Sequence, residues 1–300
     1  MKRWIKRALT ALAVLALLAG GALFAGVQLA QHKLQRHVSV PAYTLAEPDD
    51  VAALDRGKYL FNSRGCAECH GANGTGRVFV NDGKGVLIKA PNITAGMGGV
   101  TASYSASDWE RTVRHGVKPD GRPVFIMPSE DYNRLTDADV AALVAYARRL
   151  APATGSGAQV ELPLPVRALY GFGAIKDAAE KIDHALAPAK PVPGIVSVEH
   201  GAYVANMCIG CHGAGLSGGK IPGGPPDWPP AANLTSGEGS AMVRYADVTA
   251  LAAMFKSGKR PDGSALRVMP FASLRELNDV DVQALYMFLQ TVPPRAAGGR

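Results

Sequence analysis

Hydrophobic residues follow three patterns along this 300-residue chain. The first is an unbroken apolar run over residues 8–30, which holds no charged side chain across 23 positions. The other two are apolar stripes at helical spacing, made of Val140, Leu143, Val144 and Ala147, and of Val282, Leu285, Tyr286 and Leu289. No segment alternates convincingly between apolar and polar residues. We therefore predict an all-α fold with almost no sheet.

The first run is long enough to cross a membrane. At about 1.5 Å per residue it spans a hydrocarbon core of roughly 30 Å. Four basic residues precede it, which predicts a cytoplasmic N-terminus and an exported remainder. The alternative is a cleaved signal peptide, whose apolar region is usually about 7–15 residues long. Because cleavage candidates such as residues 20–22 fall in the middle of the run, we favour an anchor over residues 1–30.

The rest of the chain repeats itself with an offset of 142 residues. Cys66-Ala67-Glu68-Cys69-His70 corresponds to Cys208-Ile209-Gly210-Cys211-His212. Further matches occur in the same order: Pro119-Asp120-Gly121 with Pro261-Asp262-Gly263, Met127-Pro128 with Met269-Pro270, Asn92-Ile93-Thr94 with Asn233-Leu234-Thr235, and Gly57 and Tyr59 with Gly201 and Tyr203. A repeat of this kind predicts two copies of one structural unit.

Each copy is expected to fold in the same way. A short helix runs into the cysteine motif, a glycine-rich loop follows, and a second helix covers 107–115 or 248–257, with Ser107 or Asp247 near its start. The last helix should begin at Thr136 or Asn278. Asp139 or Asp281 lies three residues further on, as in a capping box. We expect Tyr146 and Phe288 of these last helices to pack on Tyr59 and Tyr203.

These elements divide the chain into six segments. They are an anchor or signal (1–30), a tether (31–50), a first domain (51–152), a linker (153–194), a second domain (195–294) and a tail (295–300). Within the linker, residues 166–186 are expected to include a helix that packs across the two domains. The tail is expected to be disordered.

Charge gives little information about partners. The formal net charge is +7, but the first seven residues supply four of the 32 basic groups. Without them 28 basic groups face 25 acidic ones. No basic and aromatic motif accompanies this small excess, so we expect no nucleic-acid binding.

The pattern Cys-x-x-Cys-His is a signature of covalent haem c attachment. Two thiols at this spacing reach the two vinyl groups of one haem, and the adjacent histidine can bind its iron. A zinc site or a redox-active Cys-x-x-Cys is the alternative. All four cysteines lie in the two motifs, and the other five histidines form no second paired pattern. We therefore predict two covalent haems.

The repeat also selects the sixth iron ligands. The first copy offers Met97 and Met127, and the second offers Met207, Met242, Met254, Met269 and Met287. Only Met127 and Met269 lie at the same distance, 57 residues, from His70 and His212. A proline follows each and resists helix formation, as suits an extended loop over the haem. Met254 and Met287, on apolar helix faces, are interpreted as core residues.

The surroundings of the two iron-binding histidines can also be predicted. A metal-binding histidine usually donates its second N–H to a carbonyl, and Pro91 and Pro230 lie where a loop could provide one. His115 and His200 have no histidine at the corresponding position of the other copy. We expect both to face solvent rather than to bind iron.

Together these motifs resemble the class I cytochrome c family, in tandem, over about 55–150 and 198–292. The set of motifs, together with the linker stretch 161–167, is similar to the cytochrome c subunits of bacterial membrane-bound alcohol and related dehydrogenases. The resemblance implies thioether bonds at Cys66, Cys69, Cys208 and Cys211, and iron ligation by His70, Met127, His212 and Met269. Those subunits typically carry three haem motifs, whereas this chain has two and an apparent N-terminal anchor.

The expected protein is therefore an electron carrier of the bacterial inner membrane, with a single N-terminal span and periplasmic haem domains. Its donor would be a partner dehydrogenase or quinol-oxidising complex, and its acceptor an oxidase or soluble cytochrome. A haem enzyme, such as a dihaem peroxidase or a thiosulfate-oxidising cytochrome, is the alternative. Because an enzyme needs an open or displaceable sixth position and both copies offer methionine, we expect no catalytic residue.

Overall fold

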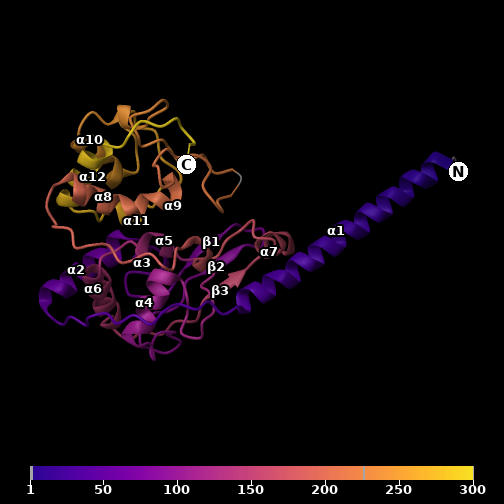
Figure 1. Ribbon diagram of the computed structural model, residues 1–300, viewed down its shortest axis with the longest axis horizontal. Coiled ribbons are helices and arrows are strands. Elements are labelled where there is room, and N and C mark those ends of the chain that lie inside the picture. Colours follow the sequence, from indigo (N-terminus) through magenta and orange to yellow (C-terminus); the bar gives the residue numbers. More distant parts are fainter. Residues whose placement is uncertain (1–2, 226, 300) are drawn as a thin grey trace.

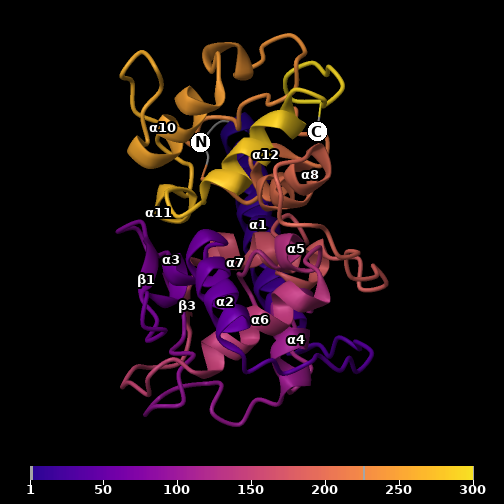
Figure 2. The same cartoon turned by 90° about the vertical axis from the view of Figure 1, so that its left-hand side faces the viewer.

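The computed structural model describes residues 3–225 and 227–299, so the first two residues of the predicted anchor and the last residue of the predicted tail lie outside it. Two helical domains are stacked on each other, and one long helix projects from the first domain (Figures 1 and 2). That helix, α1 (Arg3–Gln35), is long and apolar enough to cross a membrane. The prediction of two all-α domains behind an apolar helix is thus confirmed.

The two domains have the same order of helices. Domain one contains α2 (Val51–Ser63), α3 (Cys66–His70), α4 (Ala106–His115), α5 (Ser129–Tyr132) and α6 (Asp137–Arg148). Domain two contains α8 (Val198–Ala205), η2 (Asn206–Cys208), α9 (Ile209–His212), η3 (Met242–Arg244), α10 (Val248–Ser257), α11 (Phe271–Leu274) and α12 (Asp279–Leu289). Between them lie α7 (Leu164–Gly171) and η1 (Ala179–Lys181).

Side-chain caps set the starts of the main helices. Thr136 and Asn278 cap α6 and α12 as predicted, and Asp247 caps α10. Helix α4 starts earlier than expected, because Ser105 rather than Ser107 caps it and forms a capping box with Asp108. Ser105 is the cap because Asp108, three residues further on, accepts a hydrogen bond from the Ser105 backbone N–H.

The first and last helices of each domain cross at very short range. A Cβ on Gly57 would lie 2.1 Å from the Ala142 carbonyl oxygen, and one on Gly201 would lie 2.0 Å from that of Ala284. Only glycine lets the backbones approach so closely. These crossings, α2 with α6 and α8 with α12, form the cores on which the cysteine motifs are placed.

The structure contains a small sheet that the sequence did not reveal. Strands β1 (Val78–Asn81), β2 (Leu87–Lys89) and β3 (Gln159–Glu161) pair antiparallel in the order β1-β2-β3. The strands are only three or four residues long, too short for a clear alternating pattern. Since β3 belongs to the linker, this sheet fastens the start of the linker to domain one.

Two predictions about the connecting segments are wrong. The linker helix α7 is shorter than expected and packs against α1 instead of across the two domains. The tail is also held, because the Arg295 carbonyl accepts hydrogen bonds from the Asn233 and Thr235 side chains (2.8 and 3.2 Å). In domain one the Asn92 and Thr94 side chains donate in the same way to Ala153 (2.8 and 3.2 Å).

Candidate haem-binding sites

The first cysteine motif forms a single turn of helix directly behind α2. Gly65, with φ of 88°, adopts the left-handed conformation that ends α2 and starts the five-residue helix α3. Cys66, Cys69 and His70 therefore all lie on one short, rigid element. The Nδ1 atom of His70 lies 3.0 Å from the Pro91 carbonyl oxygen, as the sequence predicted. A carbonyl is an acceptor only, so Nδ1 carries the proton and Nε2 keeps its lone pair.

The Asn-x-Thr motif explains how this carbonyl is positioned. Asn92 follows Pro91 directly, and its side chain accepts from the Thr94 backbone N–H (2.9 Å) while donating to Ala153. The loop is thus tied to the segment that follows α6. The sequence indicated this motif only as part of the repeat, and the structure shows that it positions the Pro91 carbonyl.

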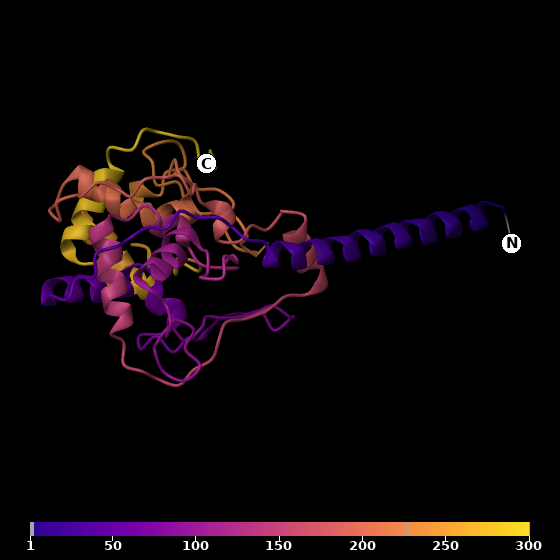
Figure 3. The same cartoon turned by 60° about the horizontal axis from the view of Figure 1, so that its bottom comes forward.

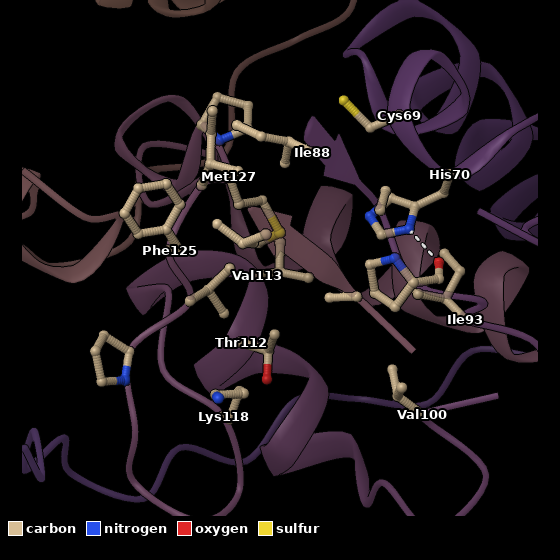
Figure 4. Close-up of a pocket in the computed structure, with 18 of the residues that line it drawn as sticks. Cys69, His70, Ile88, Ile93, Val100, Thr112, Val113, Lys118, Phe125 and Met127 are labelled. Carbon is tan, nitrogen blue, oxygen red and sulfur yellow. Dashed lines mark hydrogen bonds between the residues drawn. The ribbon is translucent and has the colours of Figure 1, made fainter. Parts of the chain in front are cut away.

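A large apolar cavity opens beside the first motif. Its volume is about 1010 Å³, and Cys66, Cys69, His70 and Met127 all line it. Figure 4 shows Met127 and His70 reaching into the cavity from different segments, with Ile88, Val113 and Phe125 among the apolar walls. Lys118 and Thr112 contribute polar groups to the same wall. The cavity therefore brings together the four residues that the sequence had singled out in the first copy.

The second motif has a related arrangement. His212 Nδ1 lies 2.8 Å from the Ala232 carbonyl oxygen, so the prediction of Pro230 as the partner is wrong. The Asn-x-Thr motif accounts for the correction, because Ala232 precedes Asn233 as Pro91 precedes Asn92. Alignment on this motif would have identified the acceptor. Cys208 and Met269 are both partly buried against the core of domain two, while Cys211 is exposed.

The other methionines occupy different environments. Met97 is 73% exposed, on a loop outside the core of domain one. Met242 and Met254 are buried in the core of domain two, as predicted for Met254, and Met207 packs on that core. Met287 is 42% exposed on α12, so its prediction as a core residue is wrong.

Burial changes the acid–base properties of the first motif. It raises the pKa of Cys66 to about 12 and that of Cys69 to about 11. It lowers the pKa of His70, despite the hydrogen bond to Pro91. In domain two, burial raises the pKa of Cys208 to about 12. At neutral pH His70 is therefore a neutral imidazole, the form that binds a metal.

Two other histidines do not face solvent as expected. His200 is 2% exposed, and its Nε2 lies 2.7 Å from Asp281 Oδ1. His115 is half-buried and stacks on His184 of the linker, with the two Nδ1 atoms 3.0 Å apart. Neither lines the cavity beside the first motif. Helical spacing alone could not reveal these contacts, because the partners lie 69 and 81 residues away in the sequence.

Hydrogen bonds between the two domains are a further feature that the sequence did not indicate. Tyr59 donates to Asp281 (2.6 Å) and accepts from the Asn278 backbone N–H (3.3 Å) of the other domain. Tyr203 does the same with Asp139 (2.6 Å) and Thr136 (3.1 Å). The Thr136 and Asn278 side chains accept directly from the Asp139 and Asp281 backbone N–H groups. The return half of the expected capping box, from the acid side chain to the N-cap backbone N–H, runs through a tyrosine of the opposite domain. Tyr59 and Tyr146 both pack against the core of domain one, and the ring that meets Tyr146 edge-on is that of Phe61.

Two helical domains, each with a Cys-x-x-Cys-His helix whose histidine is tied to a loop carbonyl, define a c-type haem protein. The first cavity fits such a group, because it is apolar, large, and lined by thiols, an imidazole with an available nitrogen, and a thioether. The chain matches the cytochrome c family over residues 54–151 and 198–293, and it belongs to that family. Members of this family carry covalently bound haem c.

Several curated proteins are similar to this chain. The fructose dehydrogenase cytochrome subunit of Gluconobacter japonicus is 28% identical over 288 residues, covering 85% of this chain and 56% of that protein. The gluconate 2-dehydrogenase cytochrome c subunit of Pantoea cypripedii is 31% identical over 38% of this chain and 27% of its own length. A cbb3-type cytochrome c oxidase subunit of Helicobacter pylori is 31% identical over 38% of this chain and 36% of its own. The chain thus spans about half of the first relative and about a third of the others.

Proposed function

We propose that this protein is a membrane-tethered, periplasmic dihaem cytochrome c that transfers electrons between a respiratory donor and a downstream acceptor. The main support is the cavity of domain one, where Met127 and His70 share a pocket with both cysteines of the motif. The repeat extends the same assignment to Cys208, Cys211, His212 and Met269 in domain two.

Each assigned residue has a distinct task. The four cysteines hold the two haems as thioethers, and His70 and His212 bind iron through Nε2 while their Nδ1 atoms fix the ring orientation. Met127 and Met269 would each supply a thioether ligand to the iron, and such a ligand would favour the reduced state. When bound, each haem supplies a one-electron couple, and the apolar walls exclude water from it.

We further propose that the chain works as the cytochrome subunit of a membrane dehydrogenase. The names of three relatives support this, since they are cytochrome subunits of fructose, gluconate and alcohol dehydrogenases. The acceptor would be an oxidase or another cytochrome. Purification from native membranes in mild detergent tests the idea, because a dehydrogenase should co-purify in a fixed ratio. A chain that consistently purifies alone would contradict the subunit assignment.

Carbon monoxide separates an electron carrier from a haem enzyme. Two closed His/Met sites should give no spectral change when the gas is added to the fully reduced, solubilised protein. Rapid binding at one haem would show an open or labile sixth position, and it would favour the enzyme alternative.

Single methionine substitutions test the ligands themselves. Met127→Ala and Met269→Ala should each open one haem to carbon monoxide. Each should lower that haem's potential by a fraction of the roughly 0.8 V that axial ligands control. Met97→Ala is the matched control, since Met97 is exposed on a loop and should leave both potentials unchanged. A Met127→Ala variant with an unaltered spectrum and potential would refute its assignment.

A further inference from the structure

The linker helix α7 exposes apolar side chains next to the membrane-spanning helix. Leu164, Leu169 and Phe172 are each about half exposed, and Leu29 is exposed on α1 beside Ala30, which contacts α7. Helix α7 lies against the base of α1, at the edge of the body from which α1 projects (Figures 1 and 3). We infer that α7 is a second membrane contact, inserted from the side into the outer boundary of the same bilayer that α1 crosses.

The first argument is continuity between the two apolar surfaces. The helices touch through small residues, since a Cβ on Gly171 would lie 2.0 Å from the Gly26 carbonyl oxygen. A Cβ on Gly26 would lie 2.7 Å from both Ala168 and the ring of Phe172. Phe172 therefore rests on the apolar run of α1 while about half of it stays exposed. Lipid that surrounds α1 at this level must also meet Phe172.

The second argument is depth. Gly26 lies four residues before the end of the uncharged run at residue 30, which is about 6 Å along the helix axis. Interfacial helices bury their apolar face roughly 5–10 Å into the boundary between headgroups and acyl chains. The contact with Gly26 thus places Phe172 at the depth that such helices occupy.

The third argument is that polar contacts fix this depth. Lys33 donates to the Tyr170 and Ile175 carbonyl oxygens (3.0 and 3.3 Å), just beyond the apolar run. Arg36 makes two hydrogen bonds, of 2.6 and 2.8 Å, to the fully buried Asp177. Because these bonds tie α1 to the segment after α7, the anchor cannot slide along its axis relative to the linker.

A lipid surface is the occupant that these observations favour. The exposed residues of α7 continue an apolar surface that is itself lipid-facing, and Lys176 lies exposed at the end of the segment, where a cation can meet phosphate headgroups. Ala30 and Leu34 of α1 and Tyr170 of α7 also line the cavity of domain one. Insertion of α7 would therefore hold this cavity at a fixed orientation close to the bilayer. The inference rests on the proposed anchor.

Spin labels on the full-length, haem-loaded protein test the insertion. All four native cysteines lie in the haem motifs, so an introduced cysteine supplies a single reactive thiol. Nitroxides at Leu169→Cys and Leu164→Cys would be compared in phosphatidylethanolamine and phosphatidylglycerol vesicles. The measurement is the ratio of two collision rates with the nitroxide, that of oxygen over that of a water-soluble nickel chelate. We expect this ratio to be severalfold higher for the α7 labels than for a label at Val243→Cys on domain two, where the side chain is 82% exposed.

A label at Leu17→Cys, in the middle of α1, separates the two hypotheses. If Leu17 lies in lipid while the α7 labels favour the nickel chelate, the anchor stands and the α7 inference is wrong. Labels on α7 that are shielded from both reagents would also overturn it, because a second protein copy would then cover the helix. If Leu17 itself is in water, the proposed anchor fails first. An unchanged haem spectrum shows that each variant is folded.

Discussion

At the scale of single residues, Asp281 and Asp139 connect the two domains. Asp281 is 1% exposed and accepts hydrogen bonds from Arg64 and Tyr59 of domain one and from His200 of its own domain (2.7, 2.6 and 2.7 Å). Asp139 accepts from Tyr203 of domain two and from Arg56 of its own domain. A buried charge needs such partners, so these residues act as a matched set.

Replacing Asp281 should therefore weaken the fold in a pH-dependent way. Burial alone would raise the pKa of Asp281, but Arg64, Tyr59 and His200 outweigh it and hold the pKa below its ordinary value. A carboxyl whose pKa falls on folding stabilises the protein above its unfolded value of about 3.9. That contribution is lost as the pH falls through the lower folded value. Asp281→Asn should cost about 3–5 kcal/mol of unfolding free energy at pH 7.

Chemical denaturation at several pH values measures this cost. The difference between the native protein and the variant should begin to shrink below about pH 4, where the unfolded carboxyl takes up a proton, and should be smallest once the pH has fallen through the lower pKa of folded Asp281. Asp55→Asn serves as the control, because Asp55 is exposed on α2. A difference that stays constant from pH 7 to the acid range would show that the charge of Asp281 is not responsible.

At the scale of elements, the glycine crossings decide how closely the helices pack. Gly57 and Gly201 lie inside helices, where alanine would ordinarily be preferred by about 1 kcal/mol. Here the obstacle is a backbone carbonyl of the partner helix, which cannot rotate away as a side chain can. The close crossing therefore outweighs helix propensity.

We expect Gly57→Ala and Gly201→Ala to destabilise their own domains by about 1–3 kcal/mol, the usual cost of overpacking. Lys58→Ala on the exposed side of α2 is the control and should be neutral or slightly stabilising. Thermal unfolding followed at the haem absorption band reports the effect. Equal stability of Gly57→Ala and Lys58→Ala would mean that the helices can move apart at no cost.

At the scale of the whole molecule, domain one encloses a cavity beside its cysteine motif, and hydrogen bonds across the interface join it to domain two. The cavity of domain one occupies about 1010 Å³ and lies beside Cys66, Cys69, His70 and Met127. We expect a domain with such a cavity to gain stability from its cofactor, because a ligand that binds only the folded state stabilises that state. Tyr59 and Arg64 of domain one donate hydrogen bonds directly to Asp281 of domain two, so a loss of order in domain one should also weaken domain two.

The double variant Cys66→Ser and Cys69→Ser tests this dependence. It should lower the haem content from two per chain to one and raise hydrogen exchange in α2 and α6. Domain two should keep its spectrum but lose stability, since Asp281 loses two of its partners. The reciprocal variant Cys208→Ser and Cys211→Ser is the matched comparison. Loss of both haems from either variant would show that the domains do not fold separately.

Local sequence determined the helical class, the repeat, the long apolar N-terminal helix and several helix starts. Thr136, Asn278 and Asp247 could be identified because a helix cap depends on residues three positions apart. The haem motif is equally local, and the equal spacing to Met127 and Met269 came from comparing one copy with the other. Met127, which lines the cavity, and its counterpart Met269 remain predicted iron ligands until the haem spectra are measured.

Tertiary structure decided the contacts that join distant segments. Tyr59 and Tyr203 belong to the same Gly-x-Tyr motif as Gly57 and Gly201. Each tyrosine hydroxyl nevertheless donates a hydrogen bond to the opposite domain. His200 is buried only because Asp281 lies beside it, and α7 packs on α1 only because Gly26 and Gly171 meet. No local periodicity encodes such pairs, since their energy comes from burial and charge pairing that exist only after the chain has folded.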